Sequence, residues 1–192
     1  MSFTVLDTSL AALRATALRV PAHRLDDPTP CSRWNVAQVL LHAAGDQHGW
    51  AATVGAGTLP AYDPFDPPAQ LTGSIAELIQ PAVDSAANVW ARIEPGSGPV
   101  RTPLPPFPTM TPELAAGACA LDAPIHAWDV AVATGQDSPL TDDLAEQLEP
   151  AARAVADALR GFAYAPPVPG QASDDASSAL LRYLGRDPRW TA

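Results

Sequence analysis

The distribution of apolar residues along the chain predicts amphipathic helices. Apolar side chains recur every three to four residues over several long segments, which is the period of an α-helix. We expect long helices over residues 6–20, 36–54, 74–93, 111–134 and 141–160, and a short one over 175–184. Alanine is abundant, while runs of β-branched and aromatic residues are scarce, so the pattern indicates an all-α fold.

Local signals mark several of the predicted helix ends. Asn35 is a suitable N-cap for the second helix, and Thr111 precedes a proline at the first position of the fourth. Gly135 and Gly185 follow the fourth and sixth helices, where glycine commonly ends a helix. Pro81 lies inside the third predicted helix, and we expect it to kink that helix or delay its start.

Two Pro-rich segments interrupt the helical pattern. They read GAGTLPAYDPFDPPAQLTG (residues 55–73) and EPGSGPVRTPLPPFPTM (residues 94–110). Proline lacks a backbone donor, so neither segment can be regular helix or central strand. Loops of this length are often functional lids, and we expect these two to shape the mouth of a substrate site. Long helices joined by such connections indicate a helical bundle, with residues 1–192 as a single domain.

Charge and cysteine content narrow the possible partners. The formal net charge of −10 at pH 7 disfavours binding to nucleic acid or to an anionic membrane surface.

Cys31 and Cys119 do not form a disulfide framework, so we expect a cytoplasmic protein, with Cys31 as a structural turn residue. No secretory signal is visible, and no apolar run approaches the roughly 18 residues that a membrane span needs. A monomer and a homodimer are equally compatible with the sequence.

Polar residues occupy the buried stripes of the second and fourth predicted helices. His42 lies at the edge of the second stripe, and Asp122 and His126 share one face of the fourth. These three could meet in the core, where two imidazoles and a carboxylate suit a catalytic zinc or a non-haem iron. The alternative is an ordinary i,i+4 pair beside a hydrogen-bonded core histidine. Asp122 has no Lys or Arg near it in sequence, which favours a cation as its partner.

Five further residues are weaker candidates for functional roles. Asp129 could hold the second nitrogen of a ligand histidine or cap a neighbouring helix. Asp46 could support His42 in the same way, although a solvated helix charge is the favoured interpretation. Cys119 could be a soft ligand or a nucleophile, but buried cysteine usually serves as core packing. Arg101, in the second Pro-rich segment, could contact an anionic substrate, and His48 is expected to be exposed.

Three segments resemble a known family. TPCSRWNVAQVLLHAAGD, HAWDVAVATGQD and LLRYLGRDPRW are similar in order and spacing to actinobacterial DinB-like metal-binding proteins related to the N-terminal domain of mycothiol-dependent maleylpyruvate isomerase. The resemblance covers nearly the whole chain. It implies a DinB-like four-helix bundle with up-down-down-up topology and additional short helices. It also implies a metal site with His42, Asp122 and His126 as ligands. Asp122 stands where the family usually has glutamate, and Pro124 lies between the last two ligands.

The resemblance leads to a functional hypothesis and two alternatives. We expect a metal-dependent enzyme that acts on a small-molecule electrophile, as a transferase or isomerase that uses a thiol such as mycothiol. Zinc is the preferred metal, ahead of nickel or iron. The first alternative is a metal-dependent hydrolase, or a pathway isomerase or cyclase, that needs no thiol. The second is a non-catalytic small-molecule-binding bundle that has lost its metal.

Overall fold

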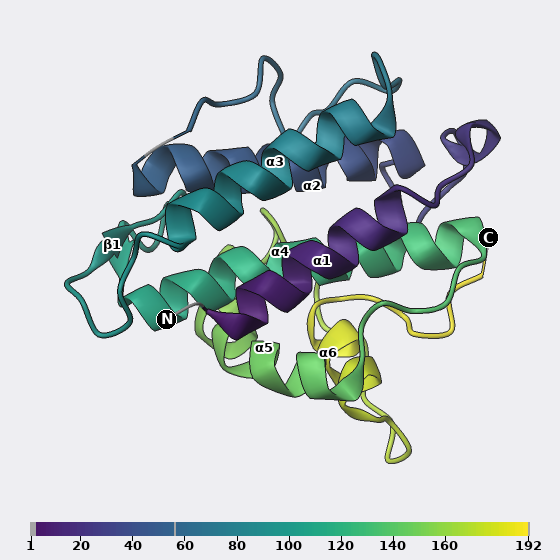
Figure 1. The fold of residues 1–192 in the computed structure, drawn as a ribbon. Coiled ribbons are helices and arrows are strands. Elements are labelled where there is room, and N and C mark those ends of the chain that lie inside the picture. Colours follow the sequence, from purple (N-terminus) through teal and green to yellow (C-terminus); the bar gives the residue numbers. More distant parts are fainter. Residues whose placement is uncertain (1–2, 56, 192) are drawn as a thin grey trace.

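The structure is a computed structural model that describes residues 3–55 and 57–191, and it is predominantly helical (Figure 1). The α-helices are α1 (Thr4–Ala17), α2 (Val36–Val54), α3 (Ile75–Trp90), α4 (Pro112–Thr134), α5 (Asp142–Val155) and α6 (Ala176–Tyr183). Two 3₁₀ turns, η1 (Ala22–Arg24) and η2 (Asp157–Leu159), and two short strands, β1 (Val100–Arg101) and β2 (Thr109–Met110), complete the secondary structure of these ranges. The predicted all-α class is confirmed.

Helices α1 to α4 form a bundle in which α1 and α4 run one way and α2 and α3 the other (Figure 1). Phe3, at the start of α1, packs against Trp90 at the end of α3, with ring centroids 5.6 Å apart. Trp50, near the end of α2, also packs against Trp90, at 6.2 Å. Gln136, just after α4, donates a hydrogen bond of 3.3 Å to the Thr16 carbonyl near the end of α1. These contacts give the expected up-down-down-up topology.

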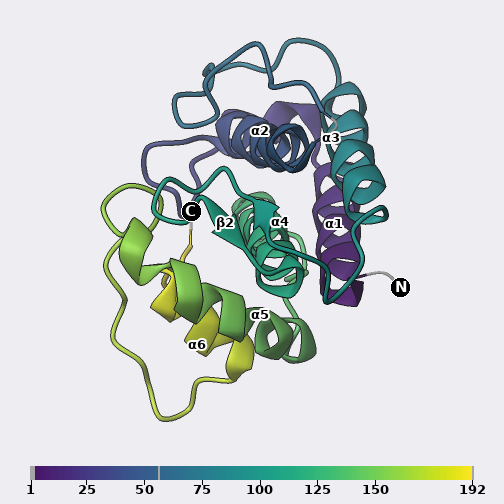
Figure 2. The ribbon, with the colours of Figure 1, turned by 90° about the vertical axis from the view of Figure 1, so that its left-hand side faces the viewer.

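Helix α4 is the central element of the molecule. Figure 2 shows it enclosed by α1, α2 and α5, and 18 of its 23 residues are buried. Its many alanines allow this close approach, and a Cβ on Gly117 would lie only 3.0 Å from the Ala151 side chain of α5. A helix that is apolar on every face belongs in a protein interior. Any polar side chain on α4 must therefore find a partner inside the protein.

Prolines inside the helices do not interrupt them. Helix α3 begins at Ile75 and continues through Pro81, so of the two expected effects, a kink or a delayed start, the delayed start is wrong. Its start is fixed by a reciprocal capping box, in which the Ser74 hydroxyl accepts from the Glu77 amide and the Glu77 carboxylate accepts from the Ser74 amide. Helix α4 likewise continues through Pro124. Each proline lacks the backbone N–H that would bond to the carbonyl four residues earlier, so each costs its helix one hydrogen bond.

Three predicted helix ends differ from the structure. Helix α1 ends at Ala17 rather than at residue 20, α3 ends at Trp90 rather than at residue 93, and α5 ends at Val155 rather than at Arg160. After η2 the chain turns at Gly161, whose φ of +80° is a left-handed conformation that favours glycine. Phe162, two residues beyond the predicted end of this helix, is exposed in the turn that follows η2.

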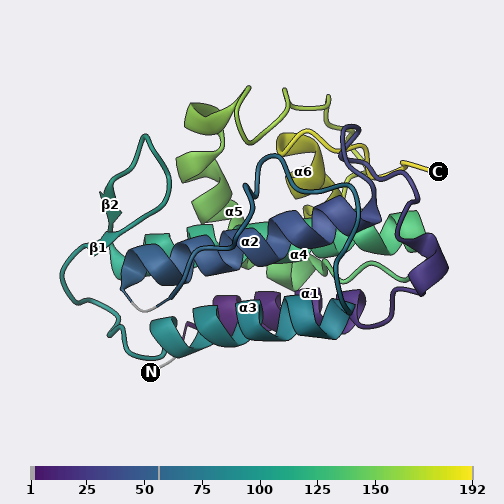
Figure 3. The ribbon, with the colours of Figure 1, turned by 90° about the horizontal axis from the view of Figure 1, so that it is seen from above.

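The loops and the C-terminal helices surround the bundle. The first Pro-rich loop runs alongside α2 (Figure 3), and the second folds back on itself where Val100 of β1 pairs with Met110 of β2. Helices α5 and α6 pack together on the side of α4 away from α3 (Figure 2). This arrangement leaves one end of the α2–α4 interface bordered by both loops and by the chain that follows α5.

None of the helices in the described ranges is both long enough and apolar enough to span a lipid bilayer.

Candidate metal centre

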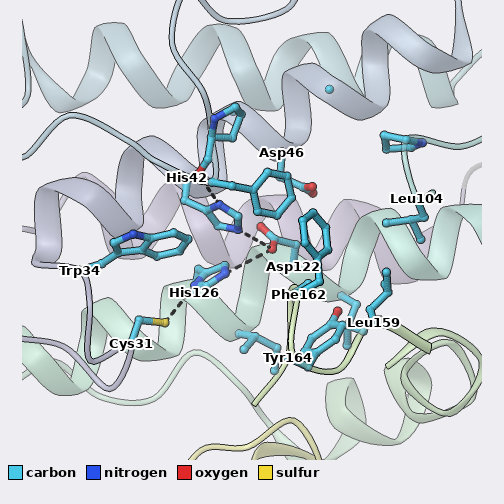
Figure 4. Close-up of a pocket in the computed structure, with 18 of the residues that line it drawn as sticks. Cys31, Trp34, His42, Asp46, Leu104, Asp122, His126, Leu159, Phe162 and Tyr164 are labelled. Carbon is cyan, nitrogen blue, oxygen red and sulfur yellow. Dashed lines mark hydrogen bonds and ion pairs between the residues drawn. The ribbon is translucent and has the colours of Figure 1, made fainter. Parts of the chain in front are cut away.

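His42 lies on the buried face of α2, and its ring is fixed on two sides. Helix α2 starts at Val36 because the Asn35 side chain accepts a hydrogen bond of 2.9 Å from the Gln38 amide. The Nδ1 atom of His42 lies 2.8 Å from the Pro64 carbonyl oxygen, and the imidazole packs against Trp34 with centroids 4.6 Å apart. These contacts turn Nε2 toward α4 (Figure 4).

The loop that carries the Pro64 carbonyl is held tightly against α2. A Cβ on Gly45 would lie 2.7 Å from the Pro64 ring, so a larger residue at position 45 would displace the loop. Tyr62 lies two residues before Pro64 in the same loop. Its hydroxyl donates a hydrogen bond of 2.8 Å to the Leu41 carbonyl of α2. The first Pro-rich loop is therefore part of the structure that orients His42.

Asp122 and His126, one turn apart on α4, face His42 across the helix interface. Asp122 Oδ1 lies 3.4 Å from His42 Nε2 and 3.3 Å from His126 Nε2. One potential ligand atom from each residue lies within 4.8 Å of the others (Figure 4). The fold thus brings together the three residues that the sequence singled out, and Pro124 between them does not separate them.

The hydrogen bonds of the two histidines determine which nitrogens face the cluster. A carbonyl oxygen can only accept, so His42 Nδ1 carries a proton and donates it to Pro64. His126 Nδ1 donates in the same way to Asp129 Oδ2 at 2.9 Å. In a neutral imidazole the remaining nitrogen then has a lone pair. Two lone pairs and the Asp122 carboxylate therefore point at one another, which is repulsive unless a cation lies among them.

The Asp122 carboxylate has unused capacity to bind a cation. Its Oδ2 atom is buried and makes no hydrogen bond to any residue of the described ranges. Burial alone would raise the pKa of Asp122, but the charge of His126 in its protonated form lowers it well below the usual range. Three protein ligands with an open fourth position are the usual arrangement of a catalytic zinc. The donor set fits a divalent metal ion.

In the absence of a metal, a proton can take the same position. Burial disfavours a charge on His126, but the Asp122 carboxylate, followed by the hydrogen bonds from Asp122 and Asp129, raises the pKa of His126. A protonated His126 would donate to Asp122 and relieve the repulsion within the cluster. A metal ion and a proton therefore compete for His126 Nε2.

Asp129 supports His126 from the opposite side. It is fully buried, and besides His126 it accepts a hydrogen bond of 3.1 Å from Arg186. Burial would raise the pKa of Asp129, but the charge of Arg186 and the contact with His126 lower it, so the carboxylate stays ionised. Of the two roles weighed from the sequence, Asp129 contacts the histidine and does not cap a helix.

A second cluster of possible ligands adjoins the first but suits a cation poorly. Cys31 Sγ lies 3.2 Å from Asp129 Oδ2 and 4.0 Å from His126 Nδ1. The Arg186 guanidinium lies 3.5 Å from the same sulfur. A fixed positive charge already occupies this position, so a second cation would be repelled. The sequence suggested only a structural role for Cys31 in a turn. In the structure Cys31 also contacts the residues that support His126.

Asp46 and His48 differ from their expected placements. Asp46 is not a solvated helix charge: it is half-buried, lines the cavity beside the cluster, and has a buried Oδ2 with no protein partner in the described ranges. Burial, followed by the negative charge of Asp122, raises its pKa. His48 is half-buried rather than exposed, and burial lowers its pKa.

Cys119 and Arg101 lie away from the cluster. Cys119 is fully buried and its thiol contacts the Gln47 side chain at 3.5 Å, so it packs the core. Arg101 is exposed on β1 and is not among the described residues that line the cavity. The proposed contact between Arg101 and an anionic substrate therefore has no support in the structure.

A cavity of about 530 Å³ opens beside the three-residue cluster. Both Pro-rich loops line it, through residues 63–65 and 103–105, as expected for loops that border a site. A third wall comes from residues 159 and 162–165, after α5, and was not predicted. The volume is typical of a site for a small organic molecule.

Arg186 and Tyr164 were not predicted from the sequence. Gly185 has φ +85°, and a Cβ there would lie 2.7 Å from the Ala165 side chain, so only glycine fits the turn that directs Arg186 inward. The GRDP motif was visible in the sequence, but its arginine lies 57 residues from Asp129. No periodicity predicts a contact over that separation.

The chain is similar to proteins of one known family. A family described as the mycothiol maleylpyruvate isomerase N-terminal domain matches residues 6–131. Two uncharacterized proteins from two strains of Mycobacterium tuberculosis are each 33% identical over 186 residues, covering 93% of this chain and 93% of their own length. No solved structure matches. The family match includes His42, Asp122 and His126, whereas Tyr164 and Arg186 lie beyond it.

Proposed function

Because the chain belongs to the family of the mycothiol maleylpyruvate isomerase N-terminal domain, we propose that it is a metal-dependent enzyme acting on a small-molecule electrophile. His42, Asp122 and His126 hold a divalent metal ion, with zinc preferred over nickel or iron. The second reactant is a low-molecular-weight thiol such as mycothiol, and the reaction is a thiol transfer or an isomerisation.

One observation carries the metal assignment. Two histidines, each with Nδ1 at hydrogen-bond distance from an acceptor, direct their Nε2 atoms at a single carboxylate whose side chain is 18% exposed. Hydrogen-bonded core histidines have no need to converge on one anion in this way. A catalytic metal site does, because its ligand histidines are oriented through the other ring nitrogen.

The surrounding residues would keep the site ready for a metal. The Pro64 carbonyl and the Asp129 carboxylate hold the two imidazoles in the required tautomer, and Arg186 balances the charge of Asp129. A bound metal would supply Lewis-acid chemistry, which lowers the pKa of a thiol and polarises a carbonyl group. The cavity walls would hold the electrophile beside the cluster and limit the access of water.

Elemental analysis tests this proposal. Protein purified without chelator or polyhistidine tag is expected to contain about one metal ion per chain. His42→Ala and His126→Ala should each lose it, because two ligands bind a divalent ion far more weakly. His23→Ala is the matched control, since His23 is exposed on η1 and should not affect metal content. Wild-type protein that stays free of metal after reconstitution with zinc, nickel and iron would contradict the proposal.

The thiol requirement separates the leading function from the alternative of a metal-dependent hydrolase or cyclase. The rate at which a model electrophile such as chlorodinitrobenzene is consumed is measured with and without mycothiol. The uncatalysed rate is subtracted from each measurement. A transferase is inactive without the thiol. Turnover of other electrophiles that is independent of thiol would favour the alternative, and metal-free protein that still binds small molecules would favour a non-catalytic bundle.

A further inference from the structure

Exposed apolar side chains gather at the mouth of the cavity. In the part of the chain that the structure describes, four large apolar residues are exposed: Leu18 (51%), Leu59 (69%), Phe65 (43%) and Phe162 (55%). All but Leu18 line the cavity beside the metal centre. Exposed apolar groups scattered singly need no explanation, but a group of them around a cavity indicates a ligand that covers them.

Phe65 and Phe162 come from different loops and meet over the cavity. Their ring centroids are 4.8 Å apart with an angle of 36° between the planes. Phe65 also meets the His42 ring edge-on, at 5.5 Å. Leu104 and Leu159 also line the cavity, on the same side as Phe162 (Figure 4). A continuous apolar surface therefore runs from the rim of the cavity to a candidate metal ligand.

The charges around this surface disfavour an anion. Three aspartates line the cavity, namely Asp46, Asp63 and Asp122. Of the two arginines that line it, Arg186 is paired with Asp129, and Arg33 is exposed to solvent. At the rim, Asp63 accepts a hydrogen bond of 2.9 Å from the Phe65 amide, so a negatively charged group held against the two phenylalanines would lie close to this carboxylate.

Tyr164 adds a single polar group to the apolar surface. Its hydroxyl makes no hydrogen bond with the residues of the described ranges, and Figure 4 shows it directed toward the Phe162 ring. Burial, followed by the charge of Asp122, raises the pKa of Tyr164, so the phenol keeps its proton at neutral pH. The surface thus offers one hydrogen-bond donor to a bound molecule.

We propose that Phe65, Leu159, Phe162 and Tyr164 form an aromatic subsite that binds a flat, uncharged ring with one hydrogen-bond acceptor. This ring belongs to the electrophile, so the subsite defines the substrate class of the enzyme. That assignment to the electrophile rests on the proposed function, whereas the binding of the ring itself does not depend on a metal ion.

Calorimetry with naphthol tests the subsite. Naphthol is expected to bind the wild-type protein, and Phe162→Ala or Phe65→Ala should weaken its binding about tenfold by removing an aromatic contact surface. Both residues are exposed, so these variants should fold, which circular dichroism verifies. Leu18→Ala is the matched control, because Leu18 is equally exposed but lies outside the cavity. Absence of naphthol binding, or equal binding by Phe162→Ala and Leu18→Ala, would overturn the subsite.

Two further titrations test its polarity. Naphthalenesulfonate, a poor metal ligand, should bind at least about tenfold more weakly than naphthol because it brings a negative charge close to the aspartates. Tyr164→Phe should weaken naphthol binding about threefold to tenfold through the lost hydrogen bond. Tighter binding of the sulfonate would refute the uncharged class, and unchanged binding by Tyr164→Phe would refute the donor role.

Naphthol binding can be tested separately from metal binding. The titrations are repeated on the same protein after chelation, with the metal content of each sample measured. Binding of naphthol that is unaffected by chelation supports the subsite even if the metal assignment fails. A metal site without naphthol binding supports the proposed function and rejects the subsite.

Discussion

At the scale of single residues, the pair of Asp129 and Arg186 connects the C-terminal turn to the candidate metal centre. Asp129 is fully buried, and the Arg186 side chain is 9% exposed, so each needs the other as a counter-charge. Removing one partner of a buried ion pair leaves an uncompensated charge, which destabilises more than the intact pair stabilises. The integrity of the fold and the orientation of His126 therefore depend on the same contact.

We predict that Arg186→Ala lowers the free energy of unfolding by about 3–5 kcal/mol, the usual cost of breaking a buried pair. Urea unfolding followed by circular dichroism measures the change. Arg189→Ala, three residues further on, removes a side chain that is 69% exposed and should cost less than about 0.5 kcal/mol. Equal effects of the two variants would mean that Asp129 is satisfied without Arg186.

The three candidate ligands could be identified from the sequence, whereas their supporting residues could not. Asp122 and His126 are four residues apart on one helix, so helical geometry alone places them together. His42 could be matched to them because it lies on another buried stripe. Arg186 and Tyr164 reach the site through turns between short helices. Their positions depend on how α6 packs, and no local period encodes that packing.

At the scale of elements, the first Pro-rich loop is attached to α2 by a tyrosine. Burial raises the pKa of Tyr62 from 10.0 to about 12. Because the folded-state pKa is raised, the stability from the protonated phenol is fully present below about pH 10 and is lost as the pH rises toward 12. Above that pH the phenolate cannot donate to the Leu41 carbonyl, and the loop loses an anchor.

We therefore expect the wild-type protein to lose thermal stability between about pH 10 and pH 12, with a component that Tyr62→Phe lacks. Melting temperatures measured across this range for both proteins isolate that component, since other tyrosines titrate in both. Parallel pH profiles of the two proteins would show that Tyr62 does not anchor the loop.

Helix existence was predictable from the sequence, but some helix ends were not. The Ser74 capping box outweighs the effect of Pro81, so α3 starts before the proline. The end of α5 depends on Gly161, which lies in a stretch where apolar periodicity continues up to Phe162. There a helix and an exposed turn produce the same pattern. Because the turn after α5 forms a wall of the cavity, this wall could not be predicted from the sequence.

At the scale of the whole molecule, a metal ion would connect α2 to α4 across the bundle. Its ligands come from two helices that are far apart in the chain, so an unfolded chain cannot present them together. Metal binding should therefore stabilise the folded state by mass action. Destroying the site removes this stabilisation without removing the bundle.

We predict that zinc raises the unfolding temperature of wild-type protein. Free zinc at about one hundred times its dissociation constant should add about 2.7 kcal/mol to the free energy of unfolding. Differential scanning calorimetry with and without a chelator measures the shift. His126→Ala should show no such shift, and His23→Ala should behave as wild type. Equal stabilisation of His126→Ala by zinc would indicate binding elsewhere.

The topology of the bundle followed from the sequence and its family resemblance, but the shape of the cavity did not. The up-down-down-up order needs only the long helices and their connections. The cavity requires the positions of three loops, whose prolines and glycines set local backbone geometry but not the packing of one loop against another.

The candidate metal ligands and the cavity rim are built on different elements, so each can change in evolution without the other. The candidate metal ligands stand on α2 and α4, while the apolar rim comes from residues 63–65 and 162–164 on separate loops. Substitutions in the rim can alter which molecules enter without disturbing the helices. A library randomised only at these loop positions should yield variants with new preferences that still bind the same ion. Substrate specificity, set by the loops, can then evolve independently of metal binding, set by the helices.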